Sequence, residues 1–364
     1  MTYYLIAGEA SGDLHGANLM RAIRQRDPHA VFRFWGGDRM AEVGGTQVED
    51  YRNTAFMGFW EVVRHLPAIW RFLRLAKRDI ARTRPDVVVL IDYPGFNLRI
   101  AKWLHTADLN TRVVYYIAPQ AWAWKPGRTE VLRRTVDDLL VILPFEEAFF
   151  TAHGCPAHAV GHPLLDALAE EAPGGRPAPV DGPVLALLPG SREQEVKTML
   201  PRFLSACARF TDHTPVVAAV PGVDRAVYED IVRGTPARVV VNDTTHVLRH
   251  ADAALVTSGT ATLECALLDV PMVVAYSGSW LSYTIGRRLV TVDHISLVNL
   301  VLDEGLVPEL IQDEARTDRL QTTLLEVMSG PGRRRQLDGF DRLRSRLGGP
   351  GASDRAAARI VQSS

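Results

Sequence analysis

Carboxylates follow two short apolar runs in the first half of the sequence, where they are placed for acid–base chemistry. Glu9 and Asp13 belong to the motif Gly8-Glu9-Ala10-Ser11-Gly12-Asp13, and Asp92 belongs to Ile91-Asp92-Tyr93-Pro94. Small polar residues with carboxylates and no adjacent cation suit a hydroxyl-bearing substrate such as a sugar. Asp92 follows the most hydrophobic run of the chain, where burial raises the pKa of a carboxyl group and makes it a usable base. Capping of the next helix is the alternative role.

Two motifs in the second half have the composition of anion-binding loops. In Leu188-Pro189-Gly190-Ser191-Arg192, we expect Gly190 to permit close approach of a ligand, Ser191 to cap the next helix and Arg192 to bind phosphate. In the segment 257–264, Ser258, Gly259 and Thr260 would present N–H and hydroxyl groups to phosphate, and Glu264 would accept the two hydroxyls of a ribose. Two such loops in one half predict a site for a nucleotide diphosphate. A capped turn and an exposed helix carboxylate are the alternatives.

Several common motifs are absent. The sequence contains no GxGxxG, GxxxxGK[ST], HExxH or GxSxG, which removes support for dinucleotide, P-loop, zincin and nucleophile-elbow sites. No Asp is followed by another Asp two positions later, so a DxD metal clamp for a diphosphate is missing. We therefore expect neither a metal nor a cofactor. Neutralisation of the diphosphate is assigned to helix ends and basic side chains.

Composition and charge narrow the class of protein further. Lys plus Arg number 41 and Asp plus Glu number 42, and this balance disfavours nucleic acid as a partner. The three cysteines are scattered, which suits a reducing compartment and excludes a disulfide framework. No stretch of about 18 residues lacks charges, and the first residues do not resemble a signal peptide. We expect a cytoplasmic protein or one on a membrane surface.

Short apolar runs alternate with helical patterns along the chain, which predicts parallel sheets covered on both faces. The Pro- and Gly-rich segment 172–183 reads as a linker between two doubly wound α/β domains that face each other across a cleft. Ligands of such sheets bind beyond the carboxyl ends of the strands. The expected parts are 1–171, 184–346 and a tail helix in 347–364 that can pack back on the first domain. Strands are expected at 3–7, 31–34, 87–91, 113–116, 139–143, 184–188, 216–220, 239–241, 253–256 and 272–275.

The segment 56–84 combines aromatic and basic residues. Trp60, Ile69 and Trp70 stand among arginines, and residues 61–84 carry seven basic and two acidic side chains, a net charge of +5. This pattern is typical of an interfacial helix on an anionic membrane surface. The alternative is an amphipathic helix packed on the sheet. Pro67 is expected to divide the segment into two pieces.

Taken together, the motifs resemble those of the lipid-A-disaccharide synthase family, from residue 3 to about residue 312. Each motif alone is weakly specific, whereas six in the same order are far more so. The six are Gly8-Glu9-Ala10-Ser11-Gly12-Asp13, Ile91-Asp92-Tyr93-Pro94-Gly95-Phe96-Asn97, Ala118-Pro119-Gln120 with Trp122-Ala123-Trp124, Gly161-His162-Pro163, Leu188-Pro189-Gly190-Ser191-Arg192 and Thr257-Ser258-Gly259-Thr260-Ala261-Thr262-Leu263-Glu264.

The resemblance implies a metal-independent GT-B glycosyltransferase with two Rossmann-like domains at the bacterial inner membrane. It would transfer 2,3-diacylglucosamine from UDP-2,3-diacylglucosamine to 2,3-diacylglucosamine 1-phosphate (lipid X) with inversion, giving lipid A disaccharide 1-phosphate and UDP. Asp92 would be the base, with Glu9 and Asp13 beside it. Some members of the family dimerise, so a homodimer is one expected state. The UDP-sugar side would comprise Arg192, Ser258, Gly259, Thr260, Glu264 and Asn299.

Other functions remain open at this point. A UDP-N-acetylglucosamine 2-epimerase or a glycosyltransferase with a soluble acceptor would have the same two-domain form. An epimerase needs no second substrate, so dependence on an acceptor separates the two reactions. A non-catalytic protein that binds a UDP-sugar or a lipid would leave the pair Glu9 and Asp92 unexplained.

Overall fold

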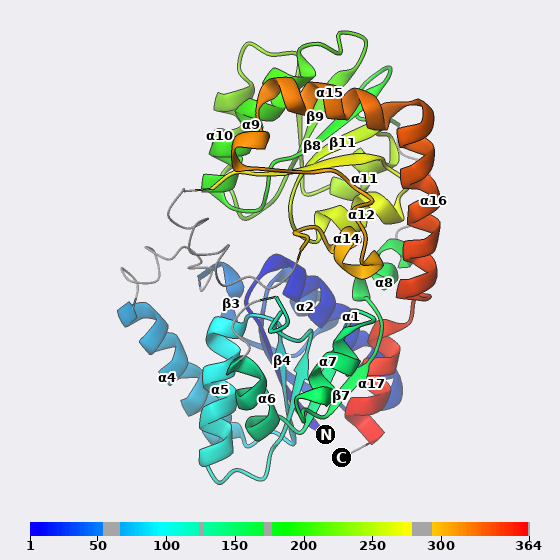
Figure 1. The fold of residues 1–364 in the computed structure, drawn as a ribbon. Helices are drawn as coiled ribbons and strands as arrows, with labels where there is room; N and C mark the ends of the chain where they lie inside the picture. Colours follow the sequence, from blue (N-terminus) through cyan, green and yellow to red (C-terminus); the bar gives the residue numbers. More distant parts are fainter. Residues whose placement is uncertain (54–65, 124–126, 171–176, 279–292, 363–364) are drawn as a thin grey trace. The chain divides into compact units, whose positions relative to one another are not determined.

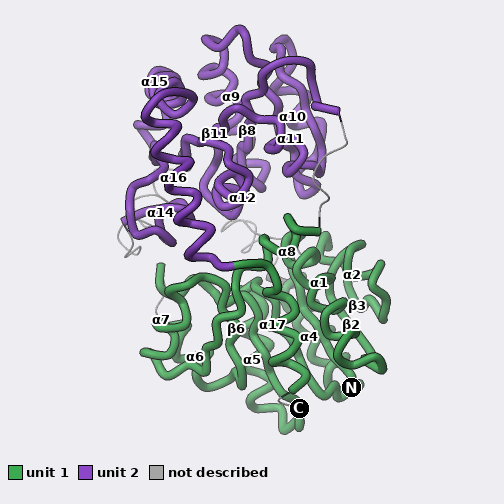
Figure 2. The backbone as a smooth tube through the Cα atoms, turned by 90° about the vertical axis from the view of Figure 1, so that its right-hand side faces the viewer, with its two compact units in different colours: residues 1–171, 349–364 green, residues 172–348 purple. Residues whose placement is uncertain are grey.

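The computed structural model describes residues 1–53, 66–123, 127–170, 177–278 and 293–362. The chain forms two α/β units, each built around its own parallel sheet (Figure 2). Unit 1 combines Met1–Glu171 with Gly349–Ser364, and unit 2 comprises Ala172–Gly348. Among the described residues, no helix is long and apolar enough to cross a membrane.

Unit 1 contains a sheet of seven parallel strands within the described residues. Its elements are β1 (Thr2–Ala7), α1 (Ala10–Arg26), β2 (Val31–Gly36), α2 (Asp38–Val43), β3 (Thr46–Asp50), η1 (Tyr51–Asn53), α4 (Leu66–Thr83), β4 (Val87–Ile91), α5 (Pro94–Thr106), β5 (Arg112–Tyr116), α6 (Gly127–Thr135), β6 (Asp138–Val141), α7 (Glu146–Ala152), β7 (Ala157–Ala159), α8 (Pro163–Glu170) and α17 (Ala352–Gln362). The strand order is β3-β2-β1-β4-β5-β6-β7. Helices α1 and α17 pack on one face and α4 and α5 on the other (Figure 1).

Helix α17 belongs to unit 1 although all of unit 2 precedes it in the sequence. Its Ala356, Ala357 and Ile360 lie in the same buried apolar cluster as β1 and α1. The Asp166 carboxylate of α8 accepts hydrogen bonds from the first backbone N–H groups of α17, including that of Ser353 at 2.7 Å. These contacts satisfy groups that a helix start leaves open.

Unit 2 contains six parallel strands within the described residues, in the order β10-β9-β8-β11-β12-β13. Its elements are β8 (Val184–Leu188), α9 (Glu193–Cys207), β9 (Thr214–Ala219), α10 (Arg225–Val232), β10 (Arg238–Val241), α11 (Thr244–Arg249), β11 (Ala253–Thr257), α12 (Ala261–Leu267), β12 (Met272–Tyr276), α14 (Leu297–Leu302), β13 (Glu309–Ile311), η2 (Gln312–Glu314), α15 (Thr317–Met328) and α16 (Gly330–Leu347). Helices α9 and α15 pack on one face, and α12 packs with α14 and α16 on the other (Figure 1).

The structure confirms the ten strands expected from apolar runs and the doubly wound class. It adds three strands that the sequence does not predict: β3, β7 and β13. All three are edge strands of their sheets, and each is short or polar. Their sequences therefore contain too little hydrophobic periodicity to predict a strand. Helix α1 starts at Ala10, so most of the first motif is helical. Pro67 is the second residue of α4, and the residues before Leu66, which the expected division concerns, lie outside the described structure.

Candidate active site

Glu9 and Asp92 leave neighbouring strands of unit 1 at the same edge of the sheet. Strands β1 and β4 pair in parallel with Ala7 opposite Ile91. The residues that follow these two strands therefore leave the sheet side by side. The ring of Tyr93 packs on Gly8, where a Cβ atom would lie 2.3 Å from the ring. Only glycine allows this approach.

The backbone of Asp92 is held in an unusual conformation. Asp92 and Tyr93 have φ values of 43° and 48°, in the left-handed region that side chains disfavour. The Asp92 carbonyl accepts hydrogen bonds from Tyr115 Oη at 2.6 Å and from Asn97 Nδ2 at 2.8 Å, and its N–H donates to the Tyr116 carbonyl at 2.9 Å. Such strain persists only where the surroundings impose it, and it is frequent at functional sites.

Electrostatics raise the pKa of Asp92 to about 7. Burial of the carboxyl group is the main cause, and the negative charge of Glu9 is the second. Glu146 raises the pKa further, whereas a backbone hydrogen bond at Tyr93 and the Arg128 guanidinium lower it. A carboxylate that titrates near neutral pH can accept a proton from a substrate hydroxyl.

The Asp13 carboxylate is buried and hydrogen-bonded within unit 1. It is 4% exposed and accepts backbone N–H groups at the start of α2, from Gly37 at 2.6 Å, Arg39 at 3.1 Å and Met40 at 3.1 Å. Asp13 therefore caps a helix that follows it in sequence, while its expected place beside the base stays a prediction. His162 also braces a turn, because its Nδ1 accepts the Leu164 N–H at 3.2 Å.

The aromatic loop after β5 closes part of the core. Trp122 is 9% exposed and donates from Nε1 to Glu146 Oε1 at 2.9 Å. The other oxygen of Glu146 accepts the backbone N–H groups of Ile142 and Leu143. Burial raises the pKa of Glu146. Trp124, which the same motif contains, lies outside the described residues.

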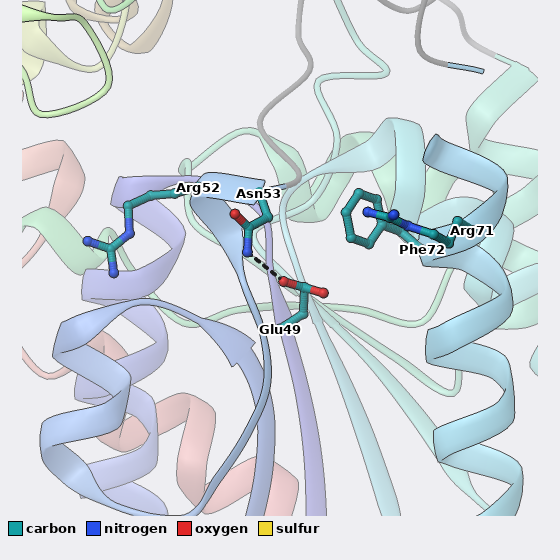
Figure 3. Close-up of a pocket in the computed structure, with 5 residues that line it drawn as sticks. All are labelled: Glu49, Arg52, Asn53, Arg71 and Phe72. Atoms are coloured by element: carbon teal, nitrogen blue, oxygen red, sulfur yellow. Dashed lines mark hydrogen bonds between the residues drawn. The ribbon is translucent and has the colours of Figure 1, made fainter. Parts of the chain in front are cut away.

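A pocket of about 560 Å³ opens beside α4 in unit 1 (Figure 3). Its lining residues are Glu49, Arg52, Asn53, Arg71 and Phe72. Asn53 donates from Nδ2 to Glu49 Oε1 at 2.8 Å, and the Arg71 guanidinium lies 4.9 Å from the centre of the Phe72 ring. Arg52 points away from these groups in the figure and pairs with two aspartates. Carboxylate, amide and guanidinium groups around one opening can hydrogen-bond to the hydroxyls of a sugar.

In unit 2, the loop between β8 and α9 is organised by Glu195. This carboxylate accepts the backbone N–H groups of Ser191 at 3.0 Å and Arg192 at 3.3 Å, so Glu195 takes the capping role expected of Ser191. Gly190 has a φ of +114°, and a Cβ atom there would lie 2.5 Å from Glu195. The Arg192 side chain is 58% exposed, with Nη1 3.5 Å from Glu195 Oε1. It can turn to a diphosphate without breaking a buried contact.

The second loop of unit 2 links β11 to α12. Gly259 and Thr260 are exposed, and Ser258 donates its hydroxyl to the Ile295 carbonyl at 2.7 Å. Glu264, one turn into α12, accepts the Thr245 hydroxyl at 2.9 Å through Oε1. Thr245 thereby fixes the carboxylate that we expect at the ribose.

Asn299 lies inside unit 2 as a brace. It is 1% exposed and uses its amide completely: Nδ2 donates to Val307 O and Glu309 Oε1, and Oδ1 accepts the N–H groups of Leu306 and Val307. No hydrogen-bonding position of this side chain is left for a ligand in the described structure. Asn299 thus shapes the loop before β13, and its expected place on the UDP-sugar side stays a prediction.

Sequence reasoning assigned no role to four residues that support three loops: Tyr115 and Asn97 at Asp92, Glu195 at Arg192, and Thr245 at Glu264. Asn97 stands in one of the six motifs, but the role of each of the four depends on contacts that only the folded chain creates. Among the described residues, no three His, Cys, Asp or Glu side chains come together as a metal site would require.

The two parallel-sheet units and the loops at their strand ends define a two-domain enzyme fold of the GT-B type. Solved structures with this fold include UDP-GlcNAc 2-epimerase from Neisseria meningitidis bound to UDP-GlcNAc, with a TM-score of 0.69, 10% identity and full coverage of both chains. A structure of S. aureus MnaA with UDP has a TM-score of 0.72 at 11% identity, covering 99% of this chain and 95% of that one. At these identities, the likeness concerns the fold alone.

The chain belongs to the lipid-A-disaccharide synthase family of glycosyltransferases. The family model described as lipid-A-disaccharide synthetase matches residues 3–356. The lipid-A-disaccharide synthase of Syntrophus aciditrophicus is 41% identical, covering 97% of this chain and 95% of the relative. That of Anaeromyxobacter dehalogenans is 38% identical, with coverages of 98% and 96%. The family expected from the six motifs is thus confirmed.

Proposed function

We propose that the protein transfers 2,3-diacylglucosamine from UDP-2,3-diacylglucosamine to lipid X. Asp92 would take the proton of the acceptor 6-hydroxyl as its oxygen bonds to the anomeric carbon of the donor. The bond from this carbon to the diphosphate breaks on the opposite face, UDP leaves with the electron pair, and the new β-1,6 linkage has inverted configuration. The single observation that carries the proposal is the Asp92 carboxyl, with a pKa of about 7, at the edge of the unit 1 sheet.

Unit 2 would bind the donor and stabilise the departing UDP. Arg192 and the backbone N–H groups of Gly259 and Thr260 offer charge and hydrogen bonds to the diphosphate. Glu264, oriented by Thr245, would accept the ribose hydroxyls. This set uses side chains and backbone N–H groups of this chain alone, and we propose that it works without a metal ion.

Product analysis tests this function. Purified protein is incubated with UDP-2,3-diacylglucosamine in EDTA, with and without lipid X, and lipids and UDP are followed by mass spectrometry. Disaccharide that forms only with lipid X, undiminished by EDTA, supports the proposal. An epimerised sugar nucleotide without acceptor, or tight UDP binding without any product, would contradict it in favour of an epimerase or a binding protein.

The pH dependence of kcat/KM should report the titration of Asp92. Because the base acts in its deprotonated form, we expect kcat/KM to rise with pH, to reach half of its plateau near pH 7, and to fall about tenfold per unit well below that. Glu9→Gln removes the negative charge that raises the Asp92 pKa, so its midpoint should move to lower pH. Asp86→Asn, on the same unit, serves as the matched control. A Glu9→Gln midpoint equal to that of the wild type would contradict the coupling.

Helix α4 has the surface that contact with a membrane needs. Phe72 and Leu73 face the core, where Phe72 packs edge-on against Trp35 at 6.1 Å, so these two belong to the packed face. Trp70, by contrast, is 62% exposed, and Arg74 and Arg78 are exposed beside it. Of the segment 56–84, residues 56–65 lie outside the described structure. We propose that the exposed face of α4 binds the anionic inner-membrane surface, where both acylated substrates reside.

Trp70→Ser combined with Arg74→Ser should weaken binding to vesicles of phosphatidylethanolamine and phosphatidylglycerol by at least about tenfold. One arginine near an anionic surface contributes about 1 kcal/mol, and loss of the Trp70 indole, which would insert into the membrane interface, adds to this. Sedimentation with vesicles measures the effect. The control is Leu325→Ser with Arg319→Ser, which removes the same kinds of exposed side chain from α15 in unit 2. Equal binding by both double variants would contradict a role for α4.

A further inference from the structure

Gln312 has features that the packing of unit 2 leaves unexplained. It directly follows β13 and has a φ of 55°, a left-handed conformation in which glutamine is disfavoured. Glycine or asparagine would adopt this turn at lower cost. A glutamine retained at such a position indicates that its side chain has a use.

The Gln312 side chain is held at one end and unpaired at the other. Ser277 donates its hydroxyl to Gln312 Oε1 at 3.4 Å. Gln312 Nε2 is buried and has no hydrogen-bond partner within the described chain. A buried N–H group without a partner is costly, so the orphan donor points to a ligand atom that accepts from it.

The strand register places Gln312 at the same edge of the sheet as the loops proposed for the sugar nucleotide. Strand β13 pairs with β12, with Ile311 opposite Tyr276. Strand β12 pairs with β11, with Ala275 opposite Thr257, the residue before Ser258. The strands are parallel, so Gln312 and Ser258 emerge from the same edge two strands apart.

Tyr276, at the end of β12, connects this region to Arg192. Burial raises the pKa of the Tyr276 phenol, the charge of Glu195 raises it further, and that of Arg192 lowers it. The phenol thus lies within electrostatic reach of the β8–α9 loop. Gln312 therefore lies at the same end of the sheet as the groups proposed to bind UDP, two strands from Ser258 and three from Arg192.

We propose that Gln312 Nε2 donates a hydrogen bond to a hydroxyl oxygen of the hexose in the sugar nucleotide, which makes Gln312 a specificity residue for the donor sugar. The assignment to this ligand rests on the proposed function. A neutral amide suits a neutral hydroxyl, whereas the diphosphate already has Arg192 and backbone N–H groups to accept its charge. Ser277 is the positioning residue that orients the amide.

The test compares the affinities of UDP and UDP-2,3-diacylglucosamine for variants, by titration calorimetry in detergent. Gln312→Gly removes the amide and relieves the backbone. We expect affinity for UDP-2,3-diacylglucosamine to fall about tenfold, as loss of one hydrogen bond implies, while affinity for UDP stays within twofold. The thermal midpoint should stay level or rise, because a side chain kept for a ligand costs stability.

Asp303→Gly is the matched control, since Asp303 has the same φ of 55° on the exposed end of α14 in unit 2. It should leave both affinities unchanged. Gln312→Asn keeps an amide and tolerates the left-handed backbone, so this variant can be tested if Gln312→Gly fails to fold. Because the asparagine side chain is shorter, it should again lower only the affinity for UDP-2,3-diacylglucosamine. Ser277→Ala should lower the affinity for UDP-2,3-diacylglucosamine to a smaller extent.

Several results would overturn the inference. Unchanged affinity for UDP-2,3-diacylglucosamine excludes the contact, an equal loss for UDP assigns the amide to the nucleotide, and a lowered thermal midpoint with unchanged affinities makes Gln312 structural. Failure of the proposed function is distinct: wild-type protein that binds the sugar nucleotide but forms no disaccharide contradicts transfer and leaves the Gln312 comparison valid. Wild-type protein that binds neither ligand overturns both.

Discussion

Asp92→Asn should lower kcat at least about a hundredfold while UDP still binds with wild-type affinity. Asparagine has nearly the shape of aspartate and accepts the left-handed backbone, so the clamp by Tyr115 and Asn97 can persist. What the substitution removes is the group that accepts the proton, and a positioned base contributes on the order of 10²–10⁴ in rate. Single-turnover kinetics with lipid X, together with calorimetry of UDP, measures both quantities.

Asp108→Asn is the matched control for this variant. Asp108 has a φ of 46° and lies exposed after α5 in the same unit, so the chemical change and the backbone conformation are alike. We expect this control to keep wild-type turnover. Near-normal turnover by Asp92→Asn would remove Asp92 from the role of base.

Arg192→Ala should lower kcat/KM by about 10²–10³-fold, the usual effect of removing a charged donor at a site where negative charge develops. The side chain is largely exposed and its contact with Glu195 is peripheral, so the fold of unit 2 should not depend on it. Glu195 still holds the backbone N–H groups of the loop in the variant. Arg192→Lys should recover part of the loss, because lysine restores the charge without the planar fork.

Arg233→Ala provides the comparison for Arg192. Arg233 is exposed directly after α10 and pairs with Asp230 of that helix at 2.6 Å. Its removal changes the net charge of unit 2 equally, but at the end of the sheet opposite to the loops that follow β8 and β11. If both variants lose the same activity, the effect of Arg192 is a general one of charge, and a specific role in UDP departure is contradicted.

The strands of both sheet centres could be predicted because a parallel strand covered on both faces is a continuous apolar run. Val87–Ile91 and Val184–Leu188 are fully buried and read unambiguously. Strands β3 and β13 could not be predicted, because edge strands keep polar residues and form hydrogen bonds on one side only, so they lack a continuous apolar run. α17 was expected to be able to return to the first domain, but its docking depends on Asp166, whose capping role no local pattern reveals.

The motif positions were more predictable than the roles of the residues within them. Asp92 follows a buried strand, so its raised pKa could be expected from sequence. Asp13 is also an aspartate in a motif of the first half, yet its carboxylate accepts three backbone N–H groups at the start of α2. Glu195 accepts the Arg192 N–H within the first turn of α9, and Thr245 of α11 donates its hydroxyl to Glu264 of α12. Such pairings follow from tertiary contact and have no signature along the chain.

The return of α17 to unit 1 has a consequence for biosynthesis. Unit 2 is continuous in sequence, so during translation it can fold as soon as its residues leave the ribosome. Unit 1 must wait: its α1 surface stays uncovered, and Asp166 has no helix to cap, until α17 emerges after all of unit 2. The order of completion is then the reverse of the order of synthesis. An apolar face of the first-made half stays open for the whole interval, and chaperones are the factors that recognise such a face.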